Sequence, residues 1–356
     1  MNKYSAKSRQ VITKPFLMPF ILVGLLFPLW GFANDITNPL VAAFKNILLI
    51  SHFESALVQF AFYGGYCLMA IPAAIFIKRF NYKQAILMGL ALYSIGCFLF
   101  IPAGKMMVFE AFLVAYFIMT CGLSFLETSA NPYILSMGDE STATQRLNFA
   151  QAFNPLGSLT GMFVAKEFIL AQLNPASETS RLELAQNDPN AFSKIQQNDL
   201  NVIVDPYLIL GIVVGVVFFI FLFSKLPGSK SSVESKLDLK PTLNRLLSNR
   251  HYKDGVIAQA FYVGAQIMCW TFIIQYGVNE LGLTKAEAQS YNMVAMVIFV
   301  SSRFICTYIL KFINPGQLLM ILAMGGGIFT LGAIFISGMV GIYSLVAISA
   351  CMSLMF

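Results

Sequence analysis

The segment MVFEAFLVAYFIMTCGLSFLETSANPYILSM, residues 107–137, decides the class of fold, because it is long enough and apolar enough to cross a lipid bilayer. A transmembrane helix needs about 20 predominantly apolar residues. Two acidic side chains interrupt this run, Glu110 near its edge and Glu127 deep inside it. We therefore predict a membrane-spanning helix that carries one carboxyl group far from both of its ends.

Nine further runs are also long and apolar, and the whole chain has the composition of a membrane protein. Apolar residues make up 57% of the chain and charged residues 11%, with a mean hydropathy of +0.71. A soluble domain carries about 25% charged residues. We predict an all-α, multi-pass membrane protein whose other spans are residues 16–44, 53–77, 83–102, 147–171, 205–225, 254–278, 287–310, 316–338 and 341–356.

The first apolar run differs from the others in its polar interior. It follows a basic N-terminus, but it leads into further spans without a clear cleavage site, so we predict a retained helix and no signal peptide. We expect this helix to tilt or to be interrupted at a group of residues that disfavour a regular apolar helix. These residues are Gly31, Asn34, Asp35, Asn38 and Pro39.

Lysine and arginine positions set the predicted orientation. With the N-terminus in the cytoplasm, 17 of the 23 basic residues fall on that side and 6 on the other. Residues 172–204 are predicted to form a polar loop on the far side. We predict a six-helix half over residues 1–225, a cytoplasmic linker over 226–252, and a second half over 253–356 with four spans, the last incomplete. Two six-helix halves need two more spans, so we expect a C-terminally truncated chain that is inactive unless the rest is supplied.

Several kinds of site find no support in the sequence. We identify no nucleophile elbow, Walker loop, HExxH motif or Gly-rich dinucleotide turn. The 6 cysteines form no CxxC pair, and both histidines lie near span edges, which argues against a disulfide framework or a metal site. We predict no cofactor, no metal and no nucleic-acid partner.

Two buried carboxyl groups are the strongest sequence evidence for function. Asp35 and Glu127 lie deep in apolar runs with no lysine or arginine nearby, whereas the other acidic residues lie in polar stretches or at run edges. A charge at the bilayer centre costs roughly 2.5–3.5 kcal/mol, so such residues usually mark an ion or substrate pathway. Asp35 shares a helix face with Asn38, and Glu127 shares one with Asn131.

Each of these charged residues also has a structural interpretation. Asp35 could be satisfied by a neighbouring amide or by water, and Glu127 could stay protonated as an interhelical hydrogen-bond donor. Arg303, in the eighth span, either snorkels to the cytoplasmic surface or holds a gate between the halves. For the acids we favour function, because desolvation disfavours the charged form of Glu127. A carboxyl group that exchanges a proton is what proton coupling requires.

Neutral amides and aromatic rings form a second group of candidates. Gln151 and Asn154 lie three residues apart in the fifth span, and Tyr262, Gln266 and Trp270 recur on one face of the seventh. Amides suit sugar hydroxyls, and aromatic rings suit the apolar face of a sugar. The same side chains could hold helices together.

Together these motifs resemble the L-fucose–proton symporter family, a branch of the major facilitator superfamily. The resemblance implies a twelve-helix bundle that imports one sugar with one proton by alternating access. The segments that carry it extend, in order, over nearly the whole chain. They are Leu29 to Asn38, Leu57 to Tyr66, Gly122 to Pro132, Leu147 to Asn154, Tyr262 to Trp270, and Arg303-Phe304.

The resemblance also implies roles for individual residues. It places the family's acid in span four on Glu127, its amide pair on Gln151 and Asn154, its span-seven aromatic on Trp270 and its basic residue on Arg303. In span one, the Asn-Asp-Ile triplet places the family's carboxylate on Asp35. An alignment without a gap from Trp30 places it on Asn38 instead.

The expected function is proton-coupled import of a monosaccharide, with L-fucose first. A hexose or N-acetylglucosamine carrier, coupled to protons or sodium, is the alternative. A membrane-embedded enzyme that uses paired carboxylates is the alternative from another class, although we expect no enzyme. Its partners are a sugar, a proton and the lipid bilayer, and we expect a monomer in the inner membrane. The predicted site is Asp35 and Glu127 for coupling and substrate, Arg303 for gating, and Asn38, Asn131, Gln151, Asn154, Tyr262, Gln266 and Trp270 for substrate.

Overall fold

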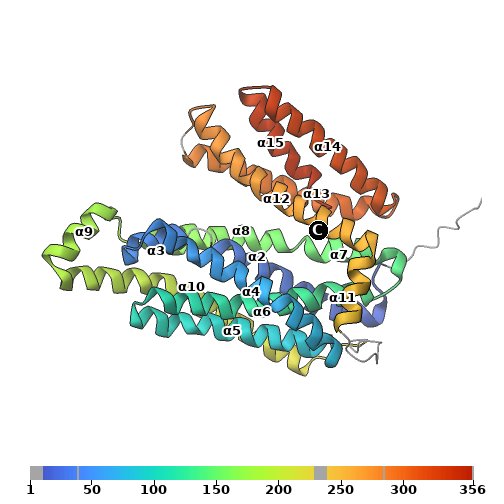
Figure 1. Ribbon diagram of the computed structural model, residues 1–356, viewed down its shortest axis with the longest axis horizontal. Coiled ribbons are helices and arrows are strands. Elements are labelled where there is room, and N and C mark those ends of the chain that lie inside the picture. Colours follow the sequence, from blue (N-terminus) through green and yellow to red (C-terminus); the bar gives the residue numbers. More distant parts are fainter. Residues whose placement is uncertain (1–10, 38–39, 228–238, 284, 355–356) are drawn as a thin grey trace, which may run out of the picture. The chain divides into compact units, whose positions relative to one another are not determined.

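The computed structural model describes residues 11–37, 40–227, 239–283 and 285–354, and every regular element within these ranges is a helix (Figure 1). Eight helical segments have the length and composition of membrane spans, and a shorter apolar helix, Met339–Cys351, follows them. The predicted all-α, multi-pass fold is confirmed. The eight segments are Lys14–Thr37, Phe53–Arg79, Tyr82–Met106, Phe109–Ser136, Pro189–Phe223, Arg250–Asn279, Glu287–Ile309 and Pro315–Phe335.

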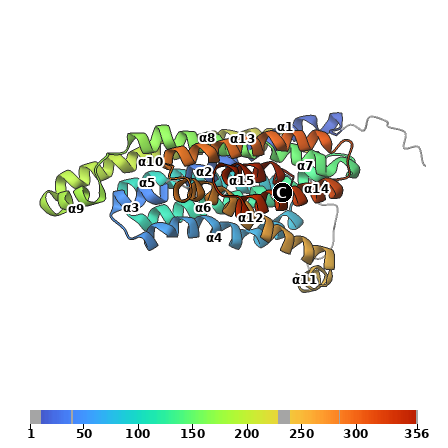
Figure 2. The same ribbon diagram turned by 90° about the horizontal axis from the view of Figure 1, so that it is seen from above.

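The chain divides into two compact units, and the larger one comprises residues 12–140 and 156–235. Within it α4, α6, α5 and α10 pack side by side in that order (Figure 2). Its helices are α1 (Leu17–Gly24), α2 (Leu26–Thr37), α3 (Leu40–Leu48), α4 (His52–Arg79), α5 (Tyr82–Met106), α6 (Phe109–Ser136), most of α8 (Asn154–Val164), the π-helical turn η3 (Ala165–Ile169), the 3-10 turn η4 (Leu170–Gln172), α9 (Glu178–Asn187) and α10 (Pro189–Phe223).

The smaller unit comprises residues 1–11, 141–155 and 236–356. Here α15 packs against α12, α13 and α14, and α7 packs against α13. The division at 226–252 predicted from the sequence stays a prediction, and residues 228–238 of that linker lie outside the described ranges. The helices of this unit are α7 (Ala143–Gln151), α11 (Leu239–Ser248), α12 (Arg250–Asn279), α13 (Lys285–Ile309), α14 (Pro315–Phe335) and α15 (Met339–Cys351).

Proline residues explain two breaks in these helices. Proline has no amide hydrogen, and its ring clashes with the carbonyl four residues earlier. Pro28 therefore disturbs the helix at Gly24, where α1 ends, and Pro155 disturbs it at Gln151, where α7 ends. The prediction of one continuous span over residues 147–171 is wrong, because α7 and α8 are separate helices that belong largely to different units.

The first span is regular over most of the residues that were expected to disturb it. The helix α2 runs without interruption through Gly31, Asn34 and Asp35, and the break within the described part of this run lies earlier, at Leu25. Asn38 and Pro39, two of the residues expected to disturb the helix, lie outside the described residues. Asp35 is thus held on a regular helical turn, which fixes the direction of its Cα–Cβ bond.

The predicted polar loop over residues 172–204 is largely helical. Ser177 and Asp188 cap the first turns of α9 and α10 with their side-chain oxygens. Arg181 of α9 donates to a carboxylate oxygen of Asp199 in α10 at 2.6 Å, and both side chains are 3% exposed. The pair ties the two helices together, and this pairing of residues 18 positions apart is not visible in the local sequence pattern.

Candidate functional site

The two predicted carboxyl groups both lie in the larger unit, each near a tyrosine of α4. Asp35, on α2, is half-buried and close enough to Tyr63 for a direct electrostatic interaction. Glu127, on α6, is half-buried and interacts in the same way with Tyr66. Glu127 forms no salt bridge or hydrogen bond with a described residue. A carboxyl group next to a neutral phenol can gain or lose a proton without breaking a salt bridge.

Tyr66 connects the α2 and α6 sides of this cluster. The Trp30 indole Nε1 donates a hydrogen bond to the Tyr66 hydroxyl at 2.6 Å, and the Ser124 hydroxyl donates to the Tyr66 backbone carbonyl at 3.3 Å. The two helices approach closely at Gly65, where a Cβ atom would collide with the Thr120 hydroxyl and lie 3.0 Å from the Phe117 backbone carbonyl oxygen. Glycine at this position lets α4 pack against α6, and this packing brings Tyr66 to Glu127.

Sequence reasoning assigned no role to Tyr63 or Tyr66. The signal was present, because two tyrosines three residues apart flank Gly64 and Gly65 and must share a helix face. What the sequence lacked was the partner across the interface. Glycine also permits a close approach at Gly157, where a Cβ atom would collide with the Pro28 backbone carbonyl.

The amide candidates are placed less regularly than their spacing suggested. Asn131 is half-buried on α6, and Asn38 lies outside the described residues. Gln151 is the last residue of α7 and Asn154 the first of α8, so the helix break separates the two amides. They do not share one regular helical face, because Pro155 prevents the helix from continuing through them.

In the smaller unit, hydrogen bonds attach α7 to α13. The Gln145 amide nitrogen donates to the Thr307 carbonyl at 2.9 Å. The Asn148 amide nitrogen donates to the Thr307 hydroxyl at 2.7 Å and to the Arg303 carbonyl at 3.2 Å. Arg303 Nη1 donates to the Gln151 carbonyl at 3.2 Å, and this is the carbonyl that Pro155 leaves without its helical donor.

Arg303 is buried and does not reach the surface, so the snorkelling interpretation is wrong. Arg303 is 2% exposed, its Nε donates to the Ser353 carbonyl at 3.1 Å, and its guanidinium lies 5.0 Å from the centre of the Phe299 ring. Together with Gln151, these contacts connect α13 to α7 and to the residues that follow α15. The guanidinium therefore occupies a position where its loss would loosen three segments.

The span-seven stripe divides into Tyr262, which holds two segments together, and Gln266 with Trp270, which lie further along α12. The Tyr262 hydroxyl donates to the Met352 carbonyl at 2.9 Å, which joins α12 to the residue that follows α15. The Trp270 ring packs edge-on against Phe299 at 5.5 Å between centroids. Its buried Nε1 finds no hydrogen-bond partner among the described residues. Gln266 is also buried, one turn from Trp270.

Two further polar atoms of this unit resemble the Trp270 indole nitrogen. Asn292 Oδ1 in α13 and Ser349 Oγ in α15 are buried without a partner in the described part of the chain. Buried polar groups normally find a partner, so these atoms are candidates for contacts with a polar ligand. Sequence reasoning missed both, because an isolated Asn or Ser in an apolar helix is common. The described residues contain no cluster of three His, Cys, Asp or Glu side chains suited to a metal.

Comparison with known proteins places this arrangement in a family. Residues 23–356 match the model of the Major Facilitator Superfamily. The L-fucose-proton symporter of Haemophilus influenzae is 52% identical over 98% of this chain and 81% of its own length. A glucose/galactose transporter of Brucella abortus is 30% identical over 93% of this chain and 76% of its own.

A solved structure gives the same result at the level of the fold. The Major Facilitator Superfamily transporter FucP, in the outward conformation, matches with a TM-score of 0.86 at 34% sequence identity, over 95% of this chain and 82% of that one. The match in sequence and the match in fold thus cover the same nearly complete stretch of the chain. The chain belongs to the Major Facilitator Superfamily, in its L-fucose–proton symporter family.

Proposed function

We propose that the protein is a secondary transporter that imports L-fucose together with a proton. The observation that carries this proposal is the 52% identity to an L-fucose-proton symporter over 98% of the chain. The arrangement of the buried carboxyl groups supports it, since a proton carrier needs acids that change charge inside the membrane. The function is transport and not catalysis, which removes the membrane-embedded enzyme from consideration. We place the protein in the inner membrane as a monomer.

Glu127 and Asp35 are the proposed coupling groups. Glu127 has a phenol beside it and no salt bridge among the described residues, so that its protonation state can follow the occupancy of the site. The Tyr66 hydroxyl accepts a hydrogen bond from the Trp30 indole and lies beside Glu127. A change in the charge of Glu127 can therefore alter the hydrogen bond between Tyr66 and Trp30. Asp35 has the analogous neighbour Tyr63. The two acid–tyrosine pairs give two places at which one proton can be held.

The proposed sugar contacts are neutral groups. In the smaller unit they are the Trp270 ring and its Nε1 donor, with Gln266 and the newly recognised Asn292 and Ser349. A flat ring suits the apolar face of a sugar, and amide and hydroxyl groups suit its hydroxyls. The remaining amide candidates are Asn38, Asn131, Gln151 and Asn154, and Tyr262 adds an aromatic ring. Arg303 is proposed to act as a gate residue through its hold on α7.

Uptake into proteoliposomes tests the function directly, and it is measured on a protein whose second half extends to the full length of the Haemophilus influenzae symporter, of which this chain spans 81%. Radiolabelled L-fucose should accumulate when the outside is acidified, and a protonophore should abolish the accumulation. Accumulation driven by a sodium gradient at equal pH would contradict proton coupling. An uptake that unlabelled glucose or galactose suppresses better than L-fucose would favour the hexose carrier, which the Brucella match supports. Failure to accumulate any sugar would contradict the proposed transport.

A further inference from the structure

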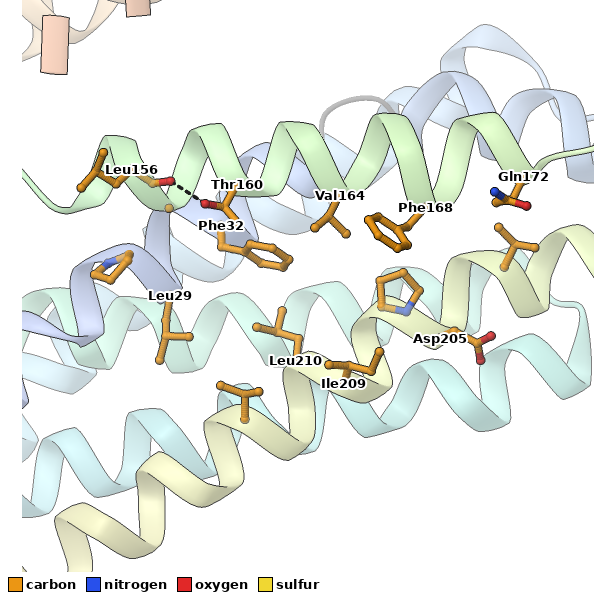
Figure 3. A pocket seen from close by; sticks show the side chains of 15 residues that line it. Leu29, Phe32, Leu156, Thr160, Val164, Phe168, Gln172, Asp205, Ile209 and Leu210 are labelled. Atoms are coloured by element: carbon orange, nitrogen blue, oxygen red, sulfur yellow. Dashed lines mark hydrogen bonds between the residues drawn. The ribbon is translucent and has the colours of Figure 1, made fainter. Parts of the chain in front are cut away.

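An apolar groove lies within the larger unit, and its lining includes none of the residues of the proposed site. It has a volume of about 810 Å³, and α2, α8 with the turns that follow it, and α10 form its walls (Figure 3). Phe168 and Val164 form one wall, and Ile209 and Leu210 form the opposite one. Phe168 is 58% exposed and Ile209 is 62% exposed, so the groove is open to the surroundings of the protein.

The groove has one polar end. Asp205 and Gln172 lie at the same end in Figure 3, and Leu29 and Leu156 lie at the other. Asp205 is exposed and forms no salt bridge or hydrogen bond with a described residue. An elongated apolar space with one carboxylate at its mouth suits an amphiphile that has a cationic head.

The position of Asp205 in the sequence indicates the depth in the membrane at which the polar end of the groove lies. Residues 206–223 include no charged side chain, and at 1.5 Å per residue this stretch is about 27 Å long. This length nearly equals the hydrocarbon core of a bilayer, about 30 Å thick. Asp205 therefore lies at the boundary between hydrocarbon and headgroups. Because the N-terminus is assigned to the cytoplasm, this is the boundary of the opposite leaflet.

The length of the groove fits one leaflet. From Asp205 to Val213 the α10 wall extends about 12 Å, against roughly 15 Å for half of a hydrocarbon core. An acyl chain can fill such a space, whereas water in an apolar groove at this depth would find few polar partners. Nothing else elongated and apolar is abundant at this level of a membrane.

The headgroup follows from the chemistry of the polar end. A carboxylate and an amide carbonyl are hydrogen-bond acceptors, and a primary ammonium offers three donors. A quaternary ammonium offers no donors, and its preferred sites are aromatic cages. We propose that the groove binds one phospholipid of the non-cytoplasmic leaflet, with its primary-ammonium headgroup at Asp205 and an acyl chain along Phe168 and Leu210.

Native mass spectrometry of the purified protein tests the proposal. The protein is titrated with dioleoyl phosphatidylethanolamine or, separately, with dioleoyl phosphatidylcholine, and the first bound lipid is quantified. We expect the ethanolamine lipid to bind about tenfold more tightly, as one charge-assisted hydrogen bond would produce. Asp205→Asn should remove most of this preference and leave binding of the choline lipid unchanged.

Two matched substitutions separate the groove from the rest of the lipid-facing surface. Thr160→Trp places a large ring in the groove and should displace both lipids, whereas Val114→Trp, on an exposed position of α6 outside the groove, should displace neither. Glu110→Gln, which neutralises another exposed acid near the same boundary, should leave the preference intact. Equal binding of the two lipids by the unaltered protein, or unchanged preference in Asp205→Asn, would overturn the proposal.

Discussion

Glu127 in α6 and Arg303 in α13 are both ionisable side chains inside apolar helices, but their surroundings differ. Arg303 donates to two backbone carbonyls, those of Ser353 and Gln151, and lies over the Phe299 ring. Glu127 has the Tyr66 phenol beside it and forms no salt bridge or hydrogen bond with a described residue. A cation held by fixed acceptors keeps its charge, whereas a carboxyl group without them can change its charge during a cycle.

The two residues should therefore have different roles, Glu127 in proton coupling and Arg303 in the stability of the fold. Removing one partner of a buried charge leaves groups unsatisfied and destabilises the fold. Replacing Glu127 by its neutral amide changes no salt bridge and should leave the fold intact. Loss of coupling with a stable fold is therefore expected at Glu127, and loss of stability at Arg303. Substitutions at and around the two residues test this distinction.

Glu127→Gln should abolish proton-driven accumulation of L-fucose. A membrane potential of about 100 mV is worth roughly 2.3 kcal/mol per charge, which supports about 50-fold accumulation because 1.4 kcal/mol corresponds to a factor of ten. The variant should fall to equal concentrations inside and outside the proteoliposome. It should still exchange internal for external L-fucose, because exchange needs no net proton movement.

Glu110→Gln is the matched control for that experiment, since it neutralises an exposed acid of the same helix. It should accumulate L-fucose as the unaltered protein does. If Glu127→Gln retained full proton-driven accumulation, Glu127 would not be the coupling group. The difference between the surroundings of Glu127 and Arg303 would then have no consequence for transport.

Arg303→Ala should lower the unfolding free energy of the purified protein by about 3–6 kcal/mol. It leaves the Gln151 and Ser353 carbonyls without the guanidinium, and hydrogen bonds to charged groups contribute about 1.5–3 kcal/mol each. Arg303→Lys keeps the charge but cannot reproduce the planar fork, so it should lie between the two. Denaturant titration in micelles measures the effect. Unfolding curves that coincide for all three proteins would show that the guanidinium contacts do not stabilise α7.

Tyr66→Phe should weaken transport moderately without changing stability much. The substitution removes the acceptor of the Trp30 indole and the phenol beside Glu127, while the ring stays in place. One hydrogen bond contributes about 1 kcal/mol, so we expect about a fivefold loss in the rate of proton-driven uptake at low sugar concentration. Tyr63→Phe tests the Asp35 pair in the same assay. An unaltered rate in both variants would exclude the tyrosines from the coupling cluster.

The sequence was informative about residues whose burial in a membrane costs free energy whatever their neighbours are. It was less informative about residues whose role depends on a tertiary contact. Apolar runs predicted the helices, and the isolated carboxyl groups of Asp35 and Glu127 were recognisable because their burial is expensive in any membrane fold. The surroundings of Glu127 were not recognisable, since Tyr66 reaches it only through the close approach of α4 and α6 at Gly65. Arg303 could not be assigned between surface and interior, because its acceptors are backbone carbonyls far away in the chain.

The helix break at Pro155 could be recognised only in part from the sequence. Its substitution should give the smallest change in unfolding free energy among these predictions. The proline was visible in the sequence and its helix-breaking effect is general, but the carbonyl it frees, at Gln151, acquires a tertiary donor that only the fold supplies. Pro155→Ala restores an amide that can bond to the same carbonyl. Arg303→Ala should then cost less in the Pro155→Ala background than in the unaltered protein, because Gln151 keeps a donor.

A double-mutant cycle measures this coupling through the unfolding free energies of the four proteins. We expect a coupling energy of about 1 kcal/mol, the contribution of one hydrogen bond. Pro28→Ala is the control, because it repairs the other proline break at a carbonyl that Arg303 does not contact. Its effect should add to that of Arg303→Ala within about 0.3–0.5 kcal/mol, as for independent sites. Additivity in both cycles would mean that Arg303 stabilises the smaller unit through Ser353 and Phe299, and that the proline break contributes nothing to its hold on α7.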